Sequence, residues 1–288
     1  MLGKSPLSRA AKAESATAPV EDLLVLADGS AAAANALAYA EALAPEGNVT
    51  ALMFGLMPAY PVSEFGGEAW LIARRDAERE AIEAEAAFRE KLVRQGSRAE
   101  VRRADVVPGD EGRVIAGHAR YVDAAIFGWA AKDSARPVRE FEAVLFNAGR
   151  PCLLVPEACA LRGAPRNVVV AWSPTREASR AIHDALPFLA AAENVSVVVV
   201  AEEWTSAEQN PGDDMARHLA RHDIKVEVKH VPAVGKLVSE VLLEEARFQG
   251  ADLIVMGGYS HSRTGEWLFG GVTRDMLGGL TVPVIMSH

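Results

Sequence analysis

The residues best suited to chemistry lie near the C-terminus, in a polar loop between two glycine pairs. An apolar run over 253–256 ends in the glycine pair 257–258, and the pair 270–271 precedes a helix that we expect to begin at Val272 and Thr273. Glycines let backbone N–H groups approach an anion closely, and a helix start offers free N–H groups and the positive end of its dipole. The pattern predicts a phosphate-binding loop, to which Thr273 can add a hydroxyl. The alternative is that the glycines serve tight turns and close packing of a helix on the sheet.

Two further polar turns follow earlier apolar runs. Asp28 comes directly after the run at 23–27, and its carboxylate can accept hydrogen bonds from an adenine or a ribose. It can equally belong to a turn that caps the next helix. Ser173 begins a Ser-Pro-Thr turn that can cap the helix after it.

Two other arrangements of reactive residues give weaker evidence for a functional site. His218 and His222 are four residues apart, as in a zinc-protease helix, but the glutamate of that motif is replaced by Leu219. A solvated helix face is favoured there. The chain has no G-x-S-x-G nucleophile elbow. We therefore predict no catalytic residue and no metal site.

These loops are positioned by an internal repeat. Four apolar segments recur in the same order, at 23–30, 48–50, 124–128 and 150–155 in the first copy and at 168–175, 194–196, 253–257 and 282–286 in the second. The runs are continuous rather than alternating, which is typical of parallel strands buried on both faces by helices. Each copy therefore predicts a doubly wound α/β domain with a five-stranded parallel sheet.

The repeat divides the chain into four segments. We expect a loose N-terminal tail over 1–20, a first domain over 21–157, a linker over 158–166 and a second domain over 167–288. The linker contains glycine and proline, which interrupt regular structure.

The expected helices include one long example. It covers about 68–95 and combines an apolar stripe with charges elsewhere, which predicts a solvated charged face. The stripe consists of Leu71, Ala77, Ala81, Ala84, Phe88 and Leu92. A shorter helix passes through Val114 and Ala119, and another is expected over 206–222.

Composition narrows the choice of partners. The net charge of -9 argues against nucleic acid and against an anionic membrane surface, because both bind basic proteins. No apolar run approaches the roughly 20 residues of a membrane-spanning helix. The first 20 residues lack the apolar stretch of a signal peptide, and the two cysteines fit a reducing compartment, so we expect a cytoplasmic protein.

Together these segments resemble a universal stress protein with two tandem UspA-type domains, over residues 21–288. The nucleotide-binding branch of that family has the motif G-x2-G-x9-G-[ST] after the fourth strand. In this chain the motif falls on Gly257, Ser260, Gly270 and Gly271, so its first and third glycines are kept.

The same branch has an aspartate at the end of its first strand. That position is Asp28 in the first domain and Ser173 in the second. The first domain lacks the glycine motif, because Val138 and Arg139 align with its last two positions. The second domain is therefore the better candidate for binding ATP or another adenine nucleotide, with Mg²⁺.

The resemblance also implies an assembly and a role. The family's domains pair through their fifth strands, here 152–155 and 284–286, which implies a pseudo-dimer within one chain and allows a larger homodimer. The implied role is a stress-response regulator without catalytic turnover, acting on an unidentified protein partner. The alternative is a protein-interaction module of the same fold that binds no nucleotide. A nucleotide-cleaving enzyme is a third hypothesis, and it requires a base or metal ligands beside the loop.

Overall fold

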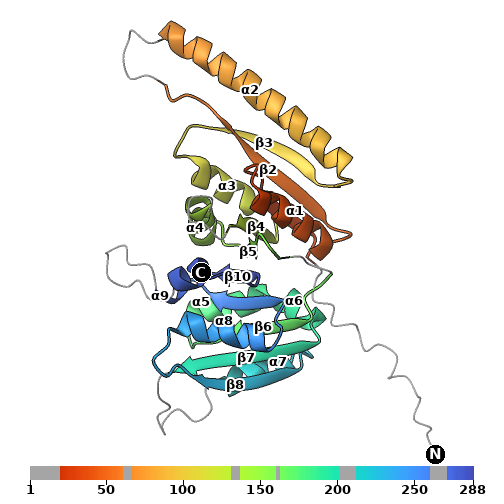
Figure 1. The fold of residues 1–288 in the computed structure, drawn as a ribbon, viewed down its shortest axis with the longest axis vertical. Helices are drawn as coiled ribbons and strands as arrows, with labels where there is room; N and C mark the ends of the chain where they lie inside the picture. Colours follow the sequence, from red (N-terminus) through yellow and green to blue (C-terminus); the bar gives the residue numbers. More distant parts are fainter. Residues whose placement is uncertain (1–19, 61–66, 131–136, 160–162, 202–211, 260–270) are drawn as a thin grey trace, which may run out of the picture.

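The two copies of the repeat form the two halves of one continuous β-sheet. The computed structural model describes residues 20–60, 67–130, 137–159, 163–201, 212–259 and 271–288. Within these ranges the sheet has ten strands in the order β3-β2-β1-β4-β5-β10-β9-β6-β7-β8 (Figure 1). The expected pair of doubly wound α/β domains is therefore confirmed.

The first half alternates strands and helices as the repeat predicts. Its elements are β1 Asp22–Leu26, α1 Ala31–Leu43, β2 Asn48–Leu56, α2 Gly67–Arg94, β3 Glu100–Val106, α3 Glu111–Ala119, β4 Ala124–Trp129, α4 Val138–Asn147 and β5 Cys152–Pro156.

The second half follows the same order with one helix divided in two. Its elements are β6 Asn167–Ala171, α5 Arg176–Asp184, α6 Leu186–Ala191, β7 Asn194–Ala201, α7 Asp213–Ala220, β8 Val226–Pro232, α8 Val238–Phe248, β9 Leu253–Gly257, α9 Gly271–Gly278 and β10 Val284–Ser287.

The halves meet through their fifth strands, as the resemblance implies. Strand β10 pairs antiparallel with β5, and Ile285 lies opposite Leu153. All other neighbouring strands in the sheet are parallel. Because each of these strands would otherwise be an open edge, their pairing satisfies N–H and C=O groups that water would have to satisfy.

Helices cover both faces of this sheet. One apolar core lies between the strands and α1, α2, α5, α6 and α7. The other lies between the strands and α3, α4, α8 and α9. The central strands are buried on both faces, which explains their continuous apolar sequences.

One pattern of hydrogen bonds between strand starts is repeated in both halves. Asp123, just before β4, accepts hydrogen bonds from the N–H groups of Glu21 and Asp22 at 2.8 and 3.0 Å. Asp252, just before β9, does the same at the start of β6, with both distances at 2.9 Å. Each carboxylate thus ties the start of a first strand to the start of a fourth, and the duplication extends to individual hydrogen bonds.

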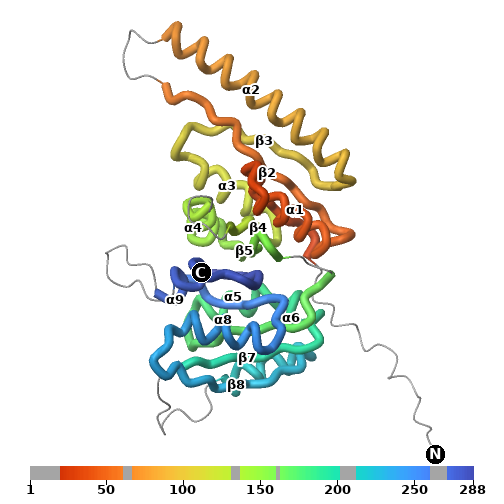
Figure 2. Tube along the Cα trace, viewed as in Figure 1, coloured from red at the N-terminus to blue at the C-terminus, as the bar shows by residue number. Residues whose placement is uncertain are grey.

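The long helix α2 differs from its predicted packing. Ala81 and Leu92 are buried, but Leu71 is 55% exposed and Ala84 is also exposed. Figures 1 and 2 show that the first turns of α2 extend beyond the strands, so the start of the expected stripe has no sheet to contact.

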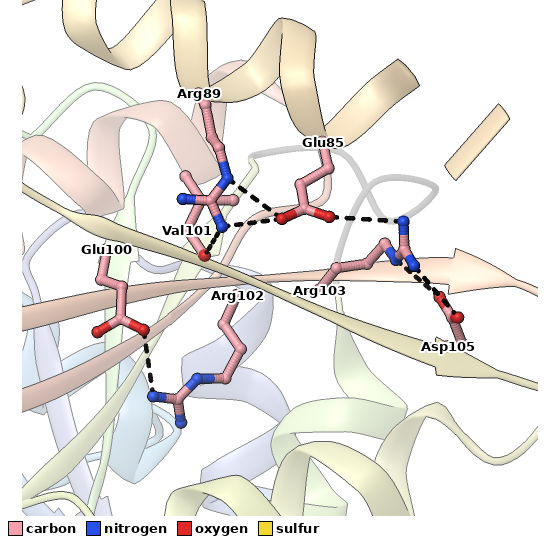
Figure 3. Close-up of polar contacts among 7 residues, drawn as sticks. All are labelled: Glu85, Arg89, Glu100, Val101, Arg102, Arg103 and Asp105. Carbon is pink, nitrogen blue, oxygen red and sulfur yellow. Dashed lines mark hydrogen bonds and ion pairs between the residues drawn. The ribbon is translucent and has the colours of Figure 1, made fainter. Parts of the chain in front are cut away.

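Part of the charged face of α2 is also not simply solvated. Glu85 accepts hydrogen bonds from Arg89 and faces Arg103 of β3 at 3.5 Å (Figure 3). Arg89 also donates to the carbonyl oxygen of Val101, and Arg103 pairs with Asp105 at 2.9 Å. The Glu85–Arg103 ion pair and the Arg89–Val101 hydrogen bond therefore join α2 to the edge strand β3.

The expected helix over 206–222 is shorter than predicted within the described residues. Helix α7 covers Asp213–Ala220, so His222 lies beyond its end, and the rings of His218 and His222 are 5.0 Å apart. Residues 202–211 lie outside the described part. In the described residues no group of three or more His, Cys, Asp or Glu side chains could hold a metal ion. None of the helices described is long and apolar enough to cross a membrane.

Candidate functional site

A cavity of about 610 Å³ opens at the carboxyl ends of the strands in the second half. Its floor is made by the ends of β6, β7 and β9, at Ala171, Val200 and Met256. Its walls are the first turns of α8 and α9. Ligands of open parallel sheets bind at this edge, and the volume lies within the usual range for ligand pockets, about 300–1,000 Å³.

The α9 wall contains the predicted loop residues that the structure describes. Gly271, Val272 and Thr273 all line the cavity, and they form the first turn of α9. Backbone N–H groups in a first turn have no partner within the helix. Ser260 and Gly270 lie outside the described residues.

Gly271 leaves space at this wall. A Cβ atom added at Gly271 would meet no atom of the described residues within 4 Å. Packing against the described residues therefore does not require a glycine at this position.

Gly257 has a different reason to be glycine. A Cβ at Gly257 would lie 2.5 Å from the amide nitrogen of Ala178 in α5. The equivalent Gly128 in β4 would meet Ala32 of α1 at 2.2 Å. Both glycines let a helix start approach the fourth strand closely. For this position the packing alternative raised by the sequence is the one observed, although Gly257 also borders the cavity.

The first-strand turn of the second half lies across the cavity from α9. Ser173 lines the cavity, and its hydroxyl lies 3.5 Å from that of Thr175. Thr175 caps α5 by accepting a hydrogen bond from the N–H of Ala178 at 3.2 Å. The predicted cap is therefore present, and it is made by Thr175, which leaves Ser173 at the cavity.

The α8 wall adds a cation that sequence reasoning missed. Lys236 lies just before α8, lines the cavity and pairs with Glu244 of that helix at 2.6 Å. The lysine is half exposed, so it can turn toward an anion in the cavity. Asp275 of α9 is the acidic residue on the opposite wall. A single lysine before a helix has no distinctive pattern, which is why the sequence did not reveal it.

The equivalent region of the first half is organised for packing. Asp28 accepts a hydrogen bond from the N–H of Ser30 at 2.9 Å, and Ser30 in turn caps α1. The carboxylate thus belongs to the capping turn. Helices α3 and α4 also approach closely, since a Cβ at Gly112 would lie 2.8 Å from that of Ala143. Asp28 lies in the other half from the cavity and is not among its lining residues.

A larger cavity, of about 760 Å³, lies at the opposite edge of the sheet. It is formed by the turn between α1 and β2 and by α6, and its acidic residues are Glu21 and Glu46. Among its described lining residues there is no basic side chain, and Pro187, in the first turn of α6, has no N–H to offer an anion. The smaller cavity therefore fits an anionic ligand better.

Comparison with known proteins assigns a family to the half of the chain that contains the cavity. The model of the universal stress protein family matches residues 165–288. The second half of this chain belongs to the universal stress protein family. No curated protein matches the chain.

Solved structures extend the likeness in fold to both halves. A universal stress protein from Archaeoglobus fulgidus is 16% identical, with a TM-score of 0.67, over 92% of this chain and 97% of its own. A putative universal stress protein from Pseudomonas aeruginosa is 12% identical, with a TM-score of 0.52, over 92% of each chain. These identities are too low to show more than a common fold. The first half is therefore a second domain of universal stress protein fold, arranged in tandem.

Proposed function

We propose that this protein is a cytoplasmic stress-response regulator whose universal stress protein domain binds an adenine nucleotide in the cavity beside α9. The observation that supports this most directly is the first turn of α9, with Gly271 unobstructed, at the carboxyl edge of the sheet. The assigned family supports the stress-response role.

The cavity offers separate contacts for the two ends of a nucleotide. The N–H groups at Gly271 and Val272, together with Lys236, suit the phosphates. Val198, Leu242 and Met256 provide an apolar surface for the base. The Ser173 hydroxyl stands where nucleotide-binding relatives have an aspartate, and it can donate or accept a hydrogen bond with the ribose.

Magnesium fits this site only as part of the nucleotide complex. Asp275 is the one acidic side chain lining the described cavity. Mg²⁺ is commonly held by one or two carboxylates together with substrate phosphates. Asp275 would therefore hold an ion that arrives with the phosphates rather than a resident metal.

The proposed role involves binding without turnover. Among the described residues that line the cavity there is no histidine or cysteine, and the one carboxylate is that of Asp275. Nucleotide occupancy would act by changing the surface that the second domain offers to a protein partner.

The test is to purify the protein without added nucleotide, denature it and identify released small molecules by mass spectrometry against a protein-free control. We expect ATP, ADP or AMP, or, if the ligand washes away, saturable binding of added ATP with magnesium. Absence of both would contradict the proposal and favour an interaction module that binds no nucleotide.

A further inference from the structure

The first domain contacts the far end of the helix that borders the cavity. The indole N–H of Trp129, at the end of β4, donates to the carbonyl oxygen of Leu277 in α9 at 2.9 Å. Trp129 is 2% exposed, so water does not compete for this bond. The last turn of a helix has carbonyl groups without partners in the helix, and here the first domain provides a donor.

The first domain is also linked to the start of α9, through Tyr259 of the second domain. The backbone N–H of Tyr259 donates to the Thr273 hydroxyl at 3.1 Å, which joins the residue after β9 to the first turn of α9. The phenol of Tyr259 donates to the Glu142 carboxylate of α4 at 2.9 Å. Its ring packs on Phe146, also of α4, with ring centres 5.1 Å apart.

Tyr259 has a conformation that local sequence does not favour. Its φ is +57°, in the left-handed region that residues with a Cβ rarely adopt. Burial raises its pKa far above the usual range, and the neighbouring Glu142 charge and hydrogen bond raise it further. The phenol therefore remains protonated and stays a donor to Glu142 at physiological pH. Tertiary contacts, including the one to Glu142, hold the residue in place.

We propose that Glu142 of the first domain is a positioning residue for the ligand cavity of the second. The chain of contacts runs from Glu142 to the Tyr259 phenol, and from the Tyr259 N–H to Thr273 on the cavity wall. The first domain thereby sets the position of α9 in its neighbour. The effect on ligand affinity rests on the proposed function, whereas the effect on α9 does not.

The first readout needs no ligand. Hydrogen–deuterium exchange of 271–278 would be compared in the full chain and in the variants Glu142→Ala, Glu142→Gln and Tyr259→Phe. Glu142→Ala and Tyr259→Phe should each speed exchange in α9 about five-fold, as expected for loss of one hydrogen bond. Glu142→Gln keeps an acceptor oxygen and should stay within about two-fold of the parent. Glu140→Ala, on the same helix, is the matched control and should change nothing.

The second readout is the dissociation constant for ATP with magnesium. We expect Glu142→Ala to raise this dissociation constant about five-fold and Glu142→Gln to leave it near the value of the parent protein. The double variant Glu142→Ala, Tyr259→Phe should bind ATP no more weakly than either single variant.

Unchanged α9 exchange in Glu142→Ala would overturn the inference whether or not ATP binds. Faster exchange with unchanged ATP affinity would also overturn it. Failure of the parent protein to bind ATP would contradict the proposed function, and the exchange result would still decide whether Glu142 positions α9.

Discussion

At the scale of single residues, His118 shows how the edge of the first domain responds to pH. His118 lies on α3, and its pKa is lowered first by burial and then by the charge of Arg102 on β3. The unfolded chain, with a histidine pKa of about 6.5, therefore binds a proton before the folded protein does. Stability falls as pH decreases below that value, because the unfolded state binds more protons there.

The prediction for this residue concerns Arg102. Arg102→Gln should raise the His118 pKa part of the way to its usual value, since the charge is removed while the burial remains. An NMR titration of the imidazole would measure it. Arg79→Gln on α2, across the sheet, is the control. An unchanged His118 pKa in Arg102→Gln would contradict the assigned cause.

Single residues also mark the limit of sequence reasoning about the site. The spacing of glycines led to Gly271 and Thr273, which line the cavity. Spacing alone could not show that Gly257 packs closely against α5 whereas Gly271 has no described atom near its Cβ position. The surroundings of each glycine depend on atoms from distant segments of the chain. Tyr259 was missed because nothing in its local sequence indicates a left-handed backbone.

At the scale of elements, close contact between helix starts and the fourth strands is common to both domains. Gly128→Ala and Gly257→Ala should each lower the free energy of unfolding by about 3 kcal/mol, since each Cβ would meet helix backbone that cannot move aside. Chemical denaturation would measure this. Gly278→Ala, at an uncrowded position in α9, is the control. A loss below about 0.5 kcal/mol at both strand positions would contradict the packing explanation.

Elements differ in how well the sequence predicts them. The central strands were predictable because burial on both faces leaves a continuous apolar run. Helix α2 was predictable in length but not in packing, since its first turns extend beyond the strands (Figure 1) and Leu71 is exposed. The link from Glu85 to Arg103 depends on which strand lies beneath α2, and a helical periodicity cannot provide that.

At the scale of the whole molecule, the two domains share one fold but differ in the surroundings of their fourth strands. The repeat predicted two domains, and the resemblance implied their pairing through β5 and β10, which the register of Ile285 and Leu153 confirms. The second domain keeps a cavity beside α9. The first has a closely packed α3–α4 pair and contacts both ends of α9. Under the proposals made above, the second copy binds the ligand and the first copy positions α9.

The most direct test of nucleotide binding in the second domain is a calorimetric titration of ATP with magnesium into the parent protein, Gly271→Val and Gly278→Val. No atom of the described residues lies within 4 Å of a Cβ added at either glycine, so both variants should fold. Of the two positions, Gly271 borders the cavity and Gly278 does not. We predict saturable binding to the parent and to Gly278→Val, and at least about a ten-fold loss in Gly271→Val, since the new side chain occupies the space beside the α9 N–H groups. Equal affinity in all three proteins would contradict the account.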